Sequence, residues 1–252
     1  MTRKTDHALL KCRIGTHARF ARFEINDWIF SFIQSRPGEK VFDLGCGTGK
    51  QSIPLAQMVG QGGRVVALDL SKDALSEIMY MVRDNHLSNI QTVNASMDLC
   101  LEILGDQGFD LIISCFAIYY ASDPVGLIQR LRSLLVSTGR IFLCGNDQDN
   151  NKELIHLLNQ VAPDGQKFQP MQPFLSDEQL KIAFTPYAYY KIGTFENPLV
   201  FPDAKSVLEY WESYSLYRPE LQTSLEQVLA GHFKKNSTFT TIKRVRGILA
   251  HA

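Results

Sequence analysis

The sequence predicts an α/β fold in which helices cover both faces of a doubly wound, mainly parallel sheet. Two observations favour this fold class. Between residues 41 and 145, short apolar segments alternate with segments of helical period. The first apolar segment also runs directly into a glycine loop that opens a helix, which is how a nucleotide-binding βαβ unit begins.

Composition predicts an ordinary soluble globular protein. The 252 residues suffice for one large domain or for a core with an added lobe. The 26 basic and 26 acidic residues balance, which disfavours a nucleic-acid partner. The five cysteines form no CxxC pair, which argues against a metal site and for a reducing compartment. We find no apolar signal core and no membrane-length apolar run, so we expect a cytoplasmic enzyme without a membrane partner.

The leading segment, residues 1–37, carries large apolar residues at helical spacing and ends at Pro37-Gly38. We interpret it as a helical segment that packs on the sheet. The remainder, residues 38–252, is then the main domain.

The glycine loop lies in the stretch Val41-Phe-Asp-Leu-Gly-Cys-Gly-Thr-Gly-Lys50. Glycine is needed where a turn takes positive φ and where a ligand approaches the backbone closely. The spacing is not that of a phosphate loop, because the first glycine is one residue too close to Lys50 and Gln51 follows the lysine. It also differs from the GxGxxG of dinucleotide sites. The pattern D-x-G-x-G-x-G, starting at Asp43, resembles instead the first motif of the class I methyltransferases that use S-adenosyl-L-methionine (SAM).

This resemblance implies a seven-stranded sheet whose last strand runs antiparallel beside the fifth. It also implies SAM as the cofactor and S-adenosyl-L-homocysteine (SAH) as its product. The candidate cofactor-binding residues lie at or just after the ends of the first four strands: Asp43, Gly45, Cys46, Gly47, Gly49, Asp69, Leu70, Ser96, Met97 and Ser114.

The segments after the glycine loop predict strands at residues 64–68, 90–94, 109–114 and 140–144, with a helix capped by Ser71 and another begun by Asp123-Pro124. We expect the second helix to end at Gly139. Further along, we expect a helix after Asn150, a short helix at 176–184 and a strand at 187–195. Two helices at 203–216 and 219–234, inside a cap insertion 203–235, precede a final strand within 238–249.

Asp69 ends the second strand, where its carboxylate can accept hydrogen bonds from both hydroxyls of a ribose. Leu70 would then pack on the adenosine. After the third strand, many relatives carry an acid that reads the adenine amino group. Here the stretch is Asn94-Ala-Ser-Met-Asp98, so Ser96, the Met97 amide or a displaced Asp98 is the candidate.

Candidate acceptor contacts lie in three places. Tyr119 and Tyr120 follow the fourth strand, where the family exposes the SAM methyl group, although packed aromatics explain them equally well. Trp211 and Tyr214 belong to an aromatic stripe that is either core or a substrate cap. In the resembled enzymes a leading segment covers the active site, which makes His17 a candidate catalytic residue. Tyr119 is a second candidate, because of its place after the fourth strand.

The sulfonium of SAM already activates the methyl group, so an enzyme must chiefly position the acceptor, and a base is not obligatory. The chain lacks the Pro-Pro-Tyr type motif of amino-group nucleic-acid methyltransferases and the Pro-Cys nucleophile of cytosine enzymes. We therefore expect a small-molecule acceptor methylated on O or N, in specialised metabolism, and a monomer or homodimer. Three alternatives stay open: a tRNA or protein methyltransferase, a SAM-binding regulatory or partner protein, and an NAD-dependent dehydrogenase.

Overall fold

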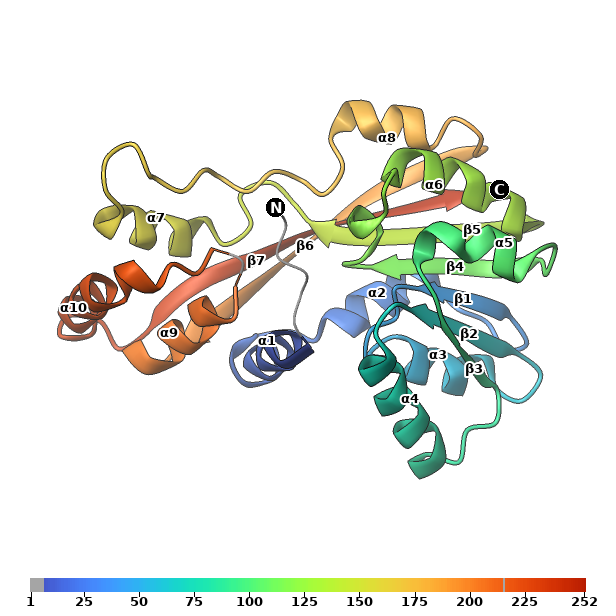
Figure 1. The fold of residues 1–252 in the computed structure, drawn as a ribbon, viewed down its shortest axis with the longest axis horizontal. Helices are drawn as coiled ribbons and strands as arrows, with labels where there is room; N and C mark the ends of the chain where they lie inside the picture. Colours follow the sequence, from blue (N-terminus) through green and yellow to red (C-terminus); the bar gives the residue numbers. More distant parts are fainter. Residues whose placement is uncertain (1–6, 215) are drawn as a thin grey trace. The chain divides into compact units, whose positions relative to one another are not determined.

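The computed structural model describes residues 7–214 and 216–252, so the first six residues of the predicted leading segment lie outside the described residues. Seven strands form one sheet in the order β3-β2-β1-β4-β5-β7-β6 (Figure 1). Their bounds are β1 Lys40–Leu44, β2 Arg64–Asp69, β3 Ile90–Asn94, β4 Phe109–Cys115, β5 Leu135–Asn146, β6 Tyr189–Phe201 and β7 Phe239–His251.

The first five strands run parallel, with β1 between β2 and β4. β7 lies antiparallel to β5, because backbone hydrogen bonds join Ala252 to Gly139 and Asp147 to Arg244 in opposite chain directions. The predicted doubly wound, mainly parallel seven-stranded sheet is confirmed.

The described chain divides into two compact units. We call the first the sheet unit; it comprises Asn26–Gly145, Pro173–Thr194 and Arg246–Ala252. The second, here the helical unit, comprises the described residues within Met1–Ile25, Asn146–Gln172 and Phe195–Val245. This division cuts the chain differently from the predicted segments 1–37 and 203–235, and the proposed lid and cap roles of those segments stay predictions.

Helices cover both faces of the parallel strands in the sheet unit (Figure 1). One face carries α2 Ile25–Ile33, α3 Ser52–Val59 and α4 Lys72–Asp84; the other carries α5 Cys100–Leu104, α6 Pro124–Leu131 and α8 Asp177–Ala183. Buried apolar strands such as β1 suit this double cover, because neither of their faces meets water. The predicted caps are confirmed: Ser71 accepts a hydrogen bond from the Ala74 N–H, and Asp123 accepts one from the Gly126 N–H.

The helical unit has a core of its own, built on large aromatic side chains that include Phe201, Tyr210 and Trp211. Its helices are α1 His7–Phe20, α7 Lys152–Val161, α9 Ala204–Glu212 and α10 Gln222–Phe233. None of the helices in the described part of the chain has the length and apolarity needed to span a bilayer.

The described part of the leading segment is helical, as predicted, and it holds two helices, because Ala21 leaves the first to form a β-bridge with Leu199. Several predicted boundaries are wrong. The helix begun at Pro124 ends at Leu131 instead of Gly139, and β5 already starts at Leu135. Gly139 lies inside that strand, where an added Cβ would come within 2.8 Å of the Phe109 carbonyl oxygen. β6 continues to Phe201, beyond its predicted end.

Candidate active site

The glycine loop joins β1 to α3 at the carboxyl edge of the parallel strands. Gly45, Gly47 and Gly49 have φ values of 75°, 54° and 84°, a backbone conformation that residues with a Cβ rarely adopt. An added Cβ at Gly45 would lie 2.4 Å from the Ala117 Cβ, and one at Gly49 would lie 2.8 Å from the Ile78 side chain. Glycine is therefore required at both positions by conformation and by space.

The start of the loop is anchored to the neighbouring strand. The backbone N–H groups of Gly45 and Cys46 both donate to the carbonyl oxygen of Leu68, at 2.8 and 3.0 Å. The Cys46 side chain is buried among apolar residues of α3, β2 and α4. Burial, and then the nearby charges of Asp43 and Asp69, raise the pKa of the Cys46 thiol well above its usual range. Cys46 thus contributes a core side chain, and its predicted contact with the cofactor stays a prediction.

Asp69, the last residue of β2, lies at the mouth of the loop. Its Oδ2 accepts a hydrogen bond from the Gly47 N–H and its Oδ1 accepts one from the Ser71 N–H, both at 2.8 Å. The Asn94 amide donates to the carbonyl oxygens of Asp69 and Leu70 and so fixes the backbone beside it. The Leu70 side chain is 63% exposed. An anchored carboxylate thus lies next to an open apolar surface.

Asp43 has a different environment. Its side chain is 1% exposed and accepts a hydrogen bond from the Ser52 hydroxyl, in the first turn of α3. Burial raises the pKa of the Asp43 carboxyl to about 7; the Ser52 hydrogen bond lowers it and the Asp69 charge raises it further. Asp43 therefore holds the start of α3 beneath the loop, and direct contact with a cofactor stays a prediction.

The loops after β3 and β4 close the other side of this edge. Ser96 caps a short turn by accepting a hydrogen bond from the Asp98 N–H, and Asp98 Oδ1 accepts one from the Ser122 N–H at 3.1 Å. The end of the Met97 side chain lies beside Gly45. Ser114 is buried, and its hydroxyl donates to the Leu44 carbonyl oxygen at 2.8 Å. Its predicted contact with the cofactor is not tested by this geometry.

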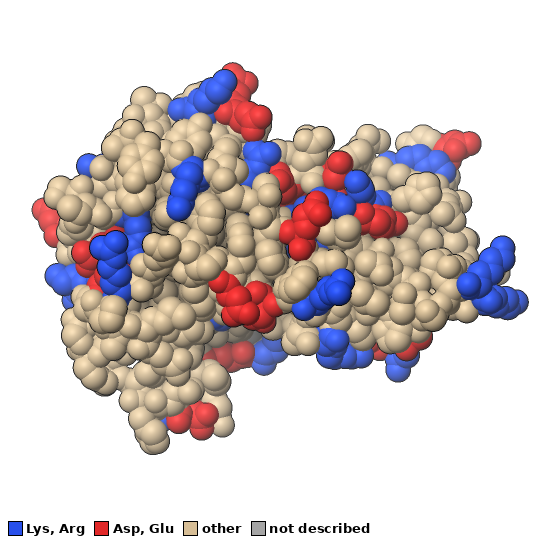
Figure 2. Space-filling model, turned by 180° about the vertical axis from the view of Figure 1, so that it is seen from behind, with Lys and Arg blue, Asp and Glu red and all other residues tan. Residues whose placement is uncertain are grey.

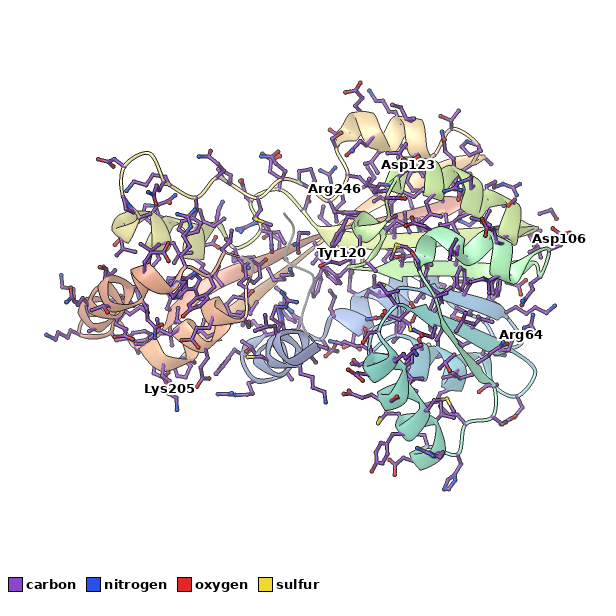
Figure 3. The ribbon with its side chains drawn as sticks, in the orientation of Figure 1. Arg64, Asp106, Tyr120, Asp123, Lys205 and Arg246 are labelled. Atoms are coloured by element: carbon purple, nitrogen blue, oxygen red, sulfur yellow. The ribbon has the colours of Figure 1, made fainter. Side chains whose placement is uncertain are left out.

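An aromatic cluster follows β4 and β5 at the same edge. We define it as Tyr119, Tyr120 and Phe174. The Tyr119 ring centroid lies 4.7 Å from that of Tyr120 and 6.4 Å from that of Phe174. Tyr120 is half exposed and marks the carboxyl edge in Figure 3, opposite Arg64 and Asp106 at the amino edge.

The sequence predicted the two tyrosines as candidates but missed Phe174. Its ring covers Gly145 at the end of β5, where an added Cβ would lie 2.5 Å from the Phe174 Cγ. The ring comes from a stretch far along the chain, after the proline-containing connection, so no local pattern connects it with the site.

Three further predicted residues belong to the helical unit. The His17 ring meets the Tyr210 ring edge-on at 6.0 Å. The Trp211 side chain is fully buried, and its Nε1 donates to the Leu216 carbonyl oxygen. The Tyr214 hydroxyl accepts a hydrogen bond from Asn150 at 2.9 Å. Trp211 and Tyr214 are core residues, the role that their stripe also allowed, and their contact with a substrate stays a prediction, as does the catalytic role of His17.

Comparison with known proteins gives a consistent result. A family model described as a methyltransferase domain matches residues 35–182, more than half of the chain. Aklanonic acid methyltransferase of a Streptomyces species is 31% identical over 104 residues, which are 41% of this chain and 46% of that protein. Demethylmenaquinone methyltransferase of Oceanobacillus iheyensis is 30% identical over 105 residues, 41% of this chain and 43% of that protein.

The alignments with these two curated relatives therefore span somewhat less than half of their length. A SAM-dependent methyltransferase from Aquifex aeolicus shares the fold, with a TM-score of 0.57 at 15% identity over 98% of this chain and 99% of that one. Since the family model covers more than half of the sequence, and the strand order and the glycine loop agree with it, the chain belongs to the class I SAM-dependent methyltransferase family.

Proposed function

We propose that this chain transfers the methyl group of SAM to an oxygen or nitrogen atom of a small, partly apolar molecule. The observation that carries the proposal is the position of the anchored Asp69 carboxylate at the mouth of the glycine loop. When bound, SAM supplies a methyl group activated by its sulfonium.

The residues at the loop fit the adenosyl part of SAM. A carboxylate has about four lone-pair sites, and the two backbone N–H groups that bind Asp69 occupy one on each oxygen. Acceptor capacity therefore remains for the two hydroxyls of a ribose. The exposed Leu70 offers an apolar surface to a base attached to that ribose. The glycine backbone lets the methionine part approach closely, because no side chain stands in the way.

The aromatic cluster supports an acceptor that is partly apolar. Aromatic rings bury large apolar area, and the two tyrosine hydroxyls can donate or accept hydrogen bonds to orient a polar group. The relatives named above point the same way, since one is named for aklanonic acid and the other for demethylmenaquinone.

Charge also favours a small molecule over RNA. Basic and acidic side chains lie intermixed on the face drawn in Figure 2. A protein that holds a polyanion commonly gathers its lysines and arginines in a stripe or patch. The net charge of zero agrees with this reading.

The contribution of the chain to catalysis would be positional. Holding an acceptor in line with the methyl group, in a site that excludes water, is worth up to about 7–11 kcal/mol. No general base is assigned, and a carboxylate acceptor would need none.

All five cysteines are free thiols, which supports the proposed cytoplasmic location.

Calorimetry with SAH, followed by a transfer assay with methyl-labelled SAM, tests the proposal. The acceptor panel contains phenols, hydroxyquinones, amines and carboxylates, with bulk tRNA as a further arm. Binding of SAH and transfer to one small-molecule class supports the proposal. Binding without transfer to any arm would favour the regulatory alternative, and transfer to tRNA would favour the second enzyme class. A chain that binds NAD but not SAH would remove the assignment.

A further inference from the structure

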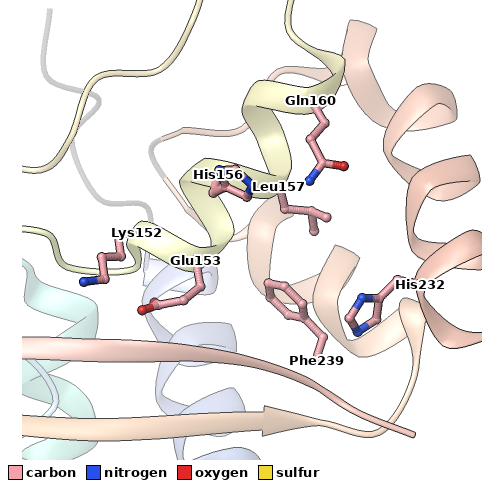
Figure 4. Close-up of a pocket in the computed structure, with 7 residues that line it drawn as sticks. All are labelled: Lys152, Glu153, His156, Leu157, Gln160, His232 and Phe239. Atoms are coloured by element: carbon pink, nitrogen blue, oxygen red, sulfur yellow. The ribbon is translucent and has the colours of Figure 1, made fainter. Parts of the chain in front are cut away.

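A cavity of about 610 Å³ that is widely open to solvent lies at the surface of the helical unit, between α7, α10 and the start of β7. Its lining consists of Lys152, Glu153, His156, Leu157, Gln160, His232 and Phe239 (Figure 4). None of these residues belongs to the glycine loop or to the aromatic cluster. The volume falls in the range of about 300–1,000 Å³ that is common for small-molecule sites.

The inner part of the cavity is apolar. Leu157 projects from α7 towards Phe239, which faces it from β7 (Figure 4). Both side chains are buried members of the helical unit's core. The His232 ring meets Phe239 edge-on at 5.7 Å, and its Nε2 lies 2.9 Å from the Thr238 carbonyl oxygen, which fixes the ring as part of the wall. The small exposed areas of Leu157 and Phe239, 5% and 8%, form an apolar floor against which a phenyl ring can rest.

The outer part of the cavity is positively charged. Lys152 and His156 are exposed, and they are four residues apart on α7, so their side chains lie on one face of the helix. Lys152 is also the first residue of α7, where the helix dipole favours an anion.

Glu153 is the one acidic residue in the lining, and its charge is compensated. Its Oε1 accepts a hydrogen bond from the Arg244 guanidinium at 3.0 Å, and its Oε2 accepts one from the Ile242 N–H at 2.9 Å. The side chain of Thr241 donates to the same Oε2. The charge that remains for a ligand is therefore that of Lys152, and the His156 ring adds a hydrogen-bonding group beside it.

We propose that this cavity is a second small-molecule site, which binds a carboxylate with an aromatic or aliphatic body. The carboxylate lies at Lys152 and His156, and the body lies on Leu157 and Phe239. The site is independent of the methyl-transfer proposal, because no residue of the SAM loop takes part in it.

Isothermal titration of the full chain with three probes of one shape tests the site. The probes are 4-phenylbutyrate, 4-phenylbutanol and 4-phenylbutylamine, which share the apolar body and differ in the charge of the head. We expect the carboxylate to bind at least about tenfold more tightly than the amine, with the alcohol between them, because opposite charges a few ångströms from Lys152 differ by about that factor. Equal binding of all three, or no binding of the carboxylate at millimolar concentration, would overturn the proposal.

Charge reversal locates the binding. Lys152→Glu should weaken 4-phenylbutyrate binding about tenfold or more, and His156→Gln should weaken it less. The matched control is Lys205→Glu, since Lys205 is also an exposed lysine in the first turn of a helix of the same unit but does not line the cavity. If Lys205→Glu weakened 4-phenylbutyrate binding as much as Lys152→Glu does, or if SAH displaced 4-phenylbutyrate, the ligand would bind elsewhere and the proposal would be overturned. Thermal unfolding of each variant confirms that it is folded, and a shift of Phe239 NMR signals on titration gives a readout that needs no variant.

Discussion

The Oδ2 atom of Asp69 lies 2.8 Å from the backbone nitrogen of Gly47, so a hydrogen bond joins the acid that ends β2 to the loop that follows β1. This hydrogen bond crosses between two neighbouring strands. It gives the carboxylate one orientation at the mouth of the loop, and binding a ribose therefore costs little further ordering of the protein.

We expect Asp69→Ala to weaken SAH binding about 100-fold or more, because it removes two hydrogen bonds to a charged acceptor that contribute about 1.5–3 kcal/mol each. Calorimetry measures this change directly. Asp106→Asn is the control, since Asp106 lies at the amino edge of the strands (Figure 3) and should leave the affinity unchanged. An Asp69→Ala protein that binds SAH like the wild type would remove Asp69 from the site.

The second prediction concerns Gly45, where the structure leaves no room for a side chain. Gly45→Ala should lower the free energy of unfolding by about 2–4 kcal/mol, because it combines positive φ with overpacking against Ala117. Urea unfolding measures the loss. Gly105→Ala is the matched control, since Gly105 also has positive φ but an added Cβ there has no neighbour within 4 Å. We expect this variant to lose only the backbone part, about 1–2 kcal/mol.

Adding Ala117→Gly to Gly45→Ala should recover the overpacking part of the loss, because it removes the Cβ that the new methyl group meets. If Gly45→Ala cost no more than Gly105→Ala, the close approach of the two loops would be disproved.

The parts of this site that could be predicted are those that a few neighbouring residues determine. Alternate glycines indicate a turn with positive φ, and Ser71 and Asp123 precede their helices at cap spacing. The start of β5 was missed for the same reason of locality, because a short apolar run such as residues 134–136 fits a helix or a strand equally well.

Contacts between stretches that are distant in the sequence could not be predicted from neighbouring residues. The Asp69–Gly47 hydrogen bond and the packing of Phe174 on Gly145 depend on which strands become neighbours. The stripe that contains Trp211 indicates that one helix face is buried, but its period does not identify what covers that face. The helical unit itself is assembled from three separate stretches of chain, which no composition change marks.

Asp43 makes stability depend on pH. Its folded pKa of about 7 lies above the ordinary value of 3.8, chiefly through burial, so the folded protein binds this proton more tightly than the unfolded chain does. The protonated Asp43 carboxyl therefore adds to the free energy of unfolding. This contribution is fully present below the ordinary pKa of 3.8 and is lost as the pH rises towards 7. Between these limits we expect the wild type to lose a few kcal/mol relative to Asp43→Asn, whose amide can still accept from the Ser52 hydroxyl.

Urea unfolding of both proteins across this pH range isolates the effect, because all other titrating groups are shared. Parallel stability curves for the wild type and Asp43→Asn would show that Asp43 does not titrate as expected.

The buried ion pair between Arg140 and Glu39 should support the sheet without affecting the site. The two side chains lie 2.8 Å apart and are each only 10% exposed, and Arg140 also donates to the carbonyl oxygens of Ile33 and Gln34. Arg140→Met leaves the Glu39 carboxylate buried and unpaired, so we expect a loss of about 3–5 kcal/mol, partly restored when Glu39→Gln is added.

Glu39 also makes the stability of the protein depend on pH. Burial alone would raise its pKa, but hydrogen bonds from Arg140 and from the Arg36 N–H outweigh burial and lower it. The contribution of Glu39 to the free energy of unfolding is therefore present above the ordinary pKa of 4.5 and is lost as the pH falls.

Glu39 precedes β1, at the amino edge, so the SAH affinity of the folded double variant should equal that of the wild type. A large fall in affinity would show that the two edges of the sheet are coupled.

Phe174 provides the test of the acceptor side. With any acceptor found in the panel, Phe174→Ala should raise the KM for that acceptor about tenfold and leave the affinity for SAH unchanged, because it removes a ring from the aromatic cluster that we propose to hold the acceptor. Gly145→Ala should act in the same direction while keeping the ring, since the new Cβ would displace it. Tyr190→Ala is the control, as Tyr190 is an aromatic residue of the same unit that packs on Phe184, outside the aromatic cluster. If Phe174→Ala lowered SAH affinity and acceptor affinity alike, Phe174 would support the fold of this edge, and the acceptor would have to bind against other residues.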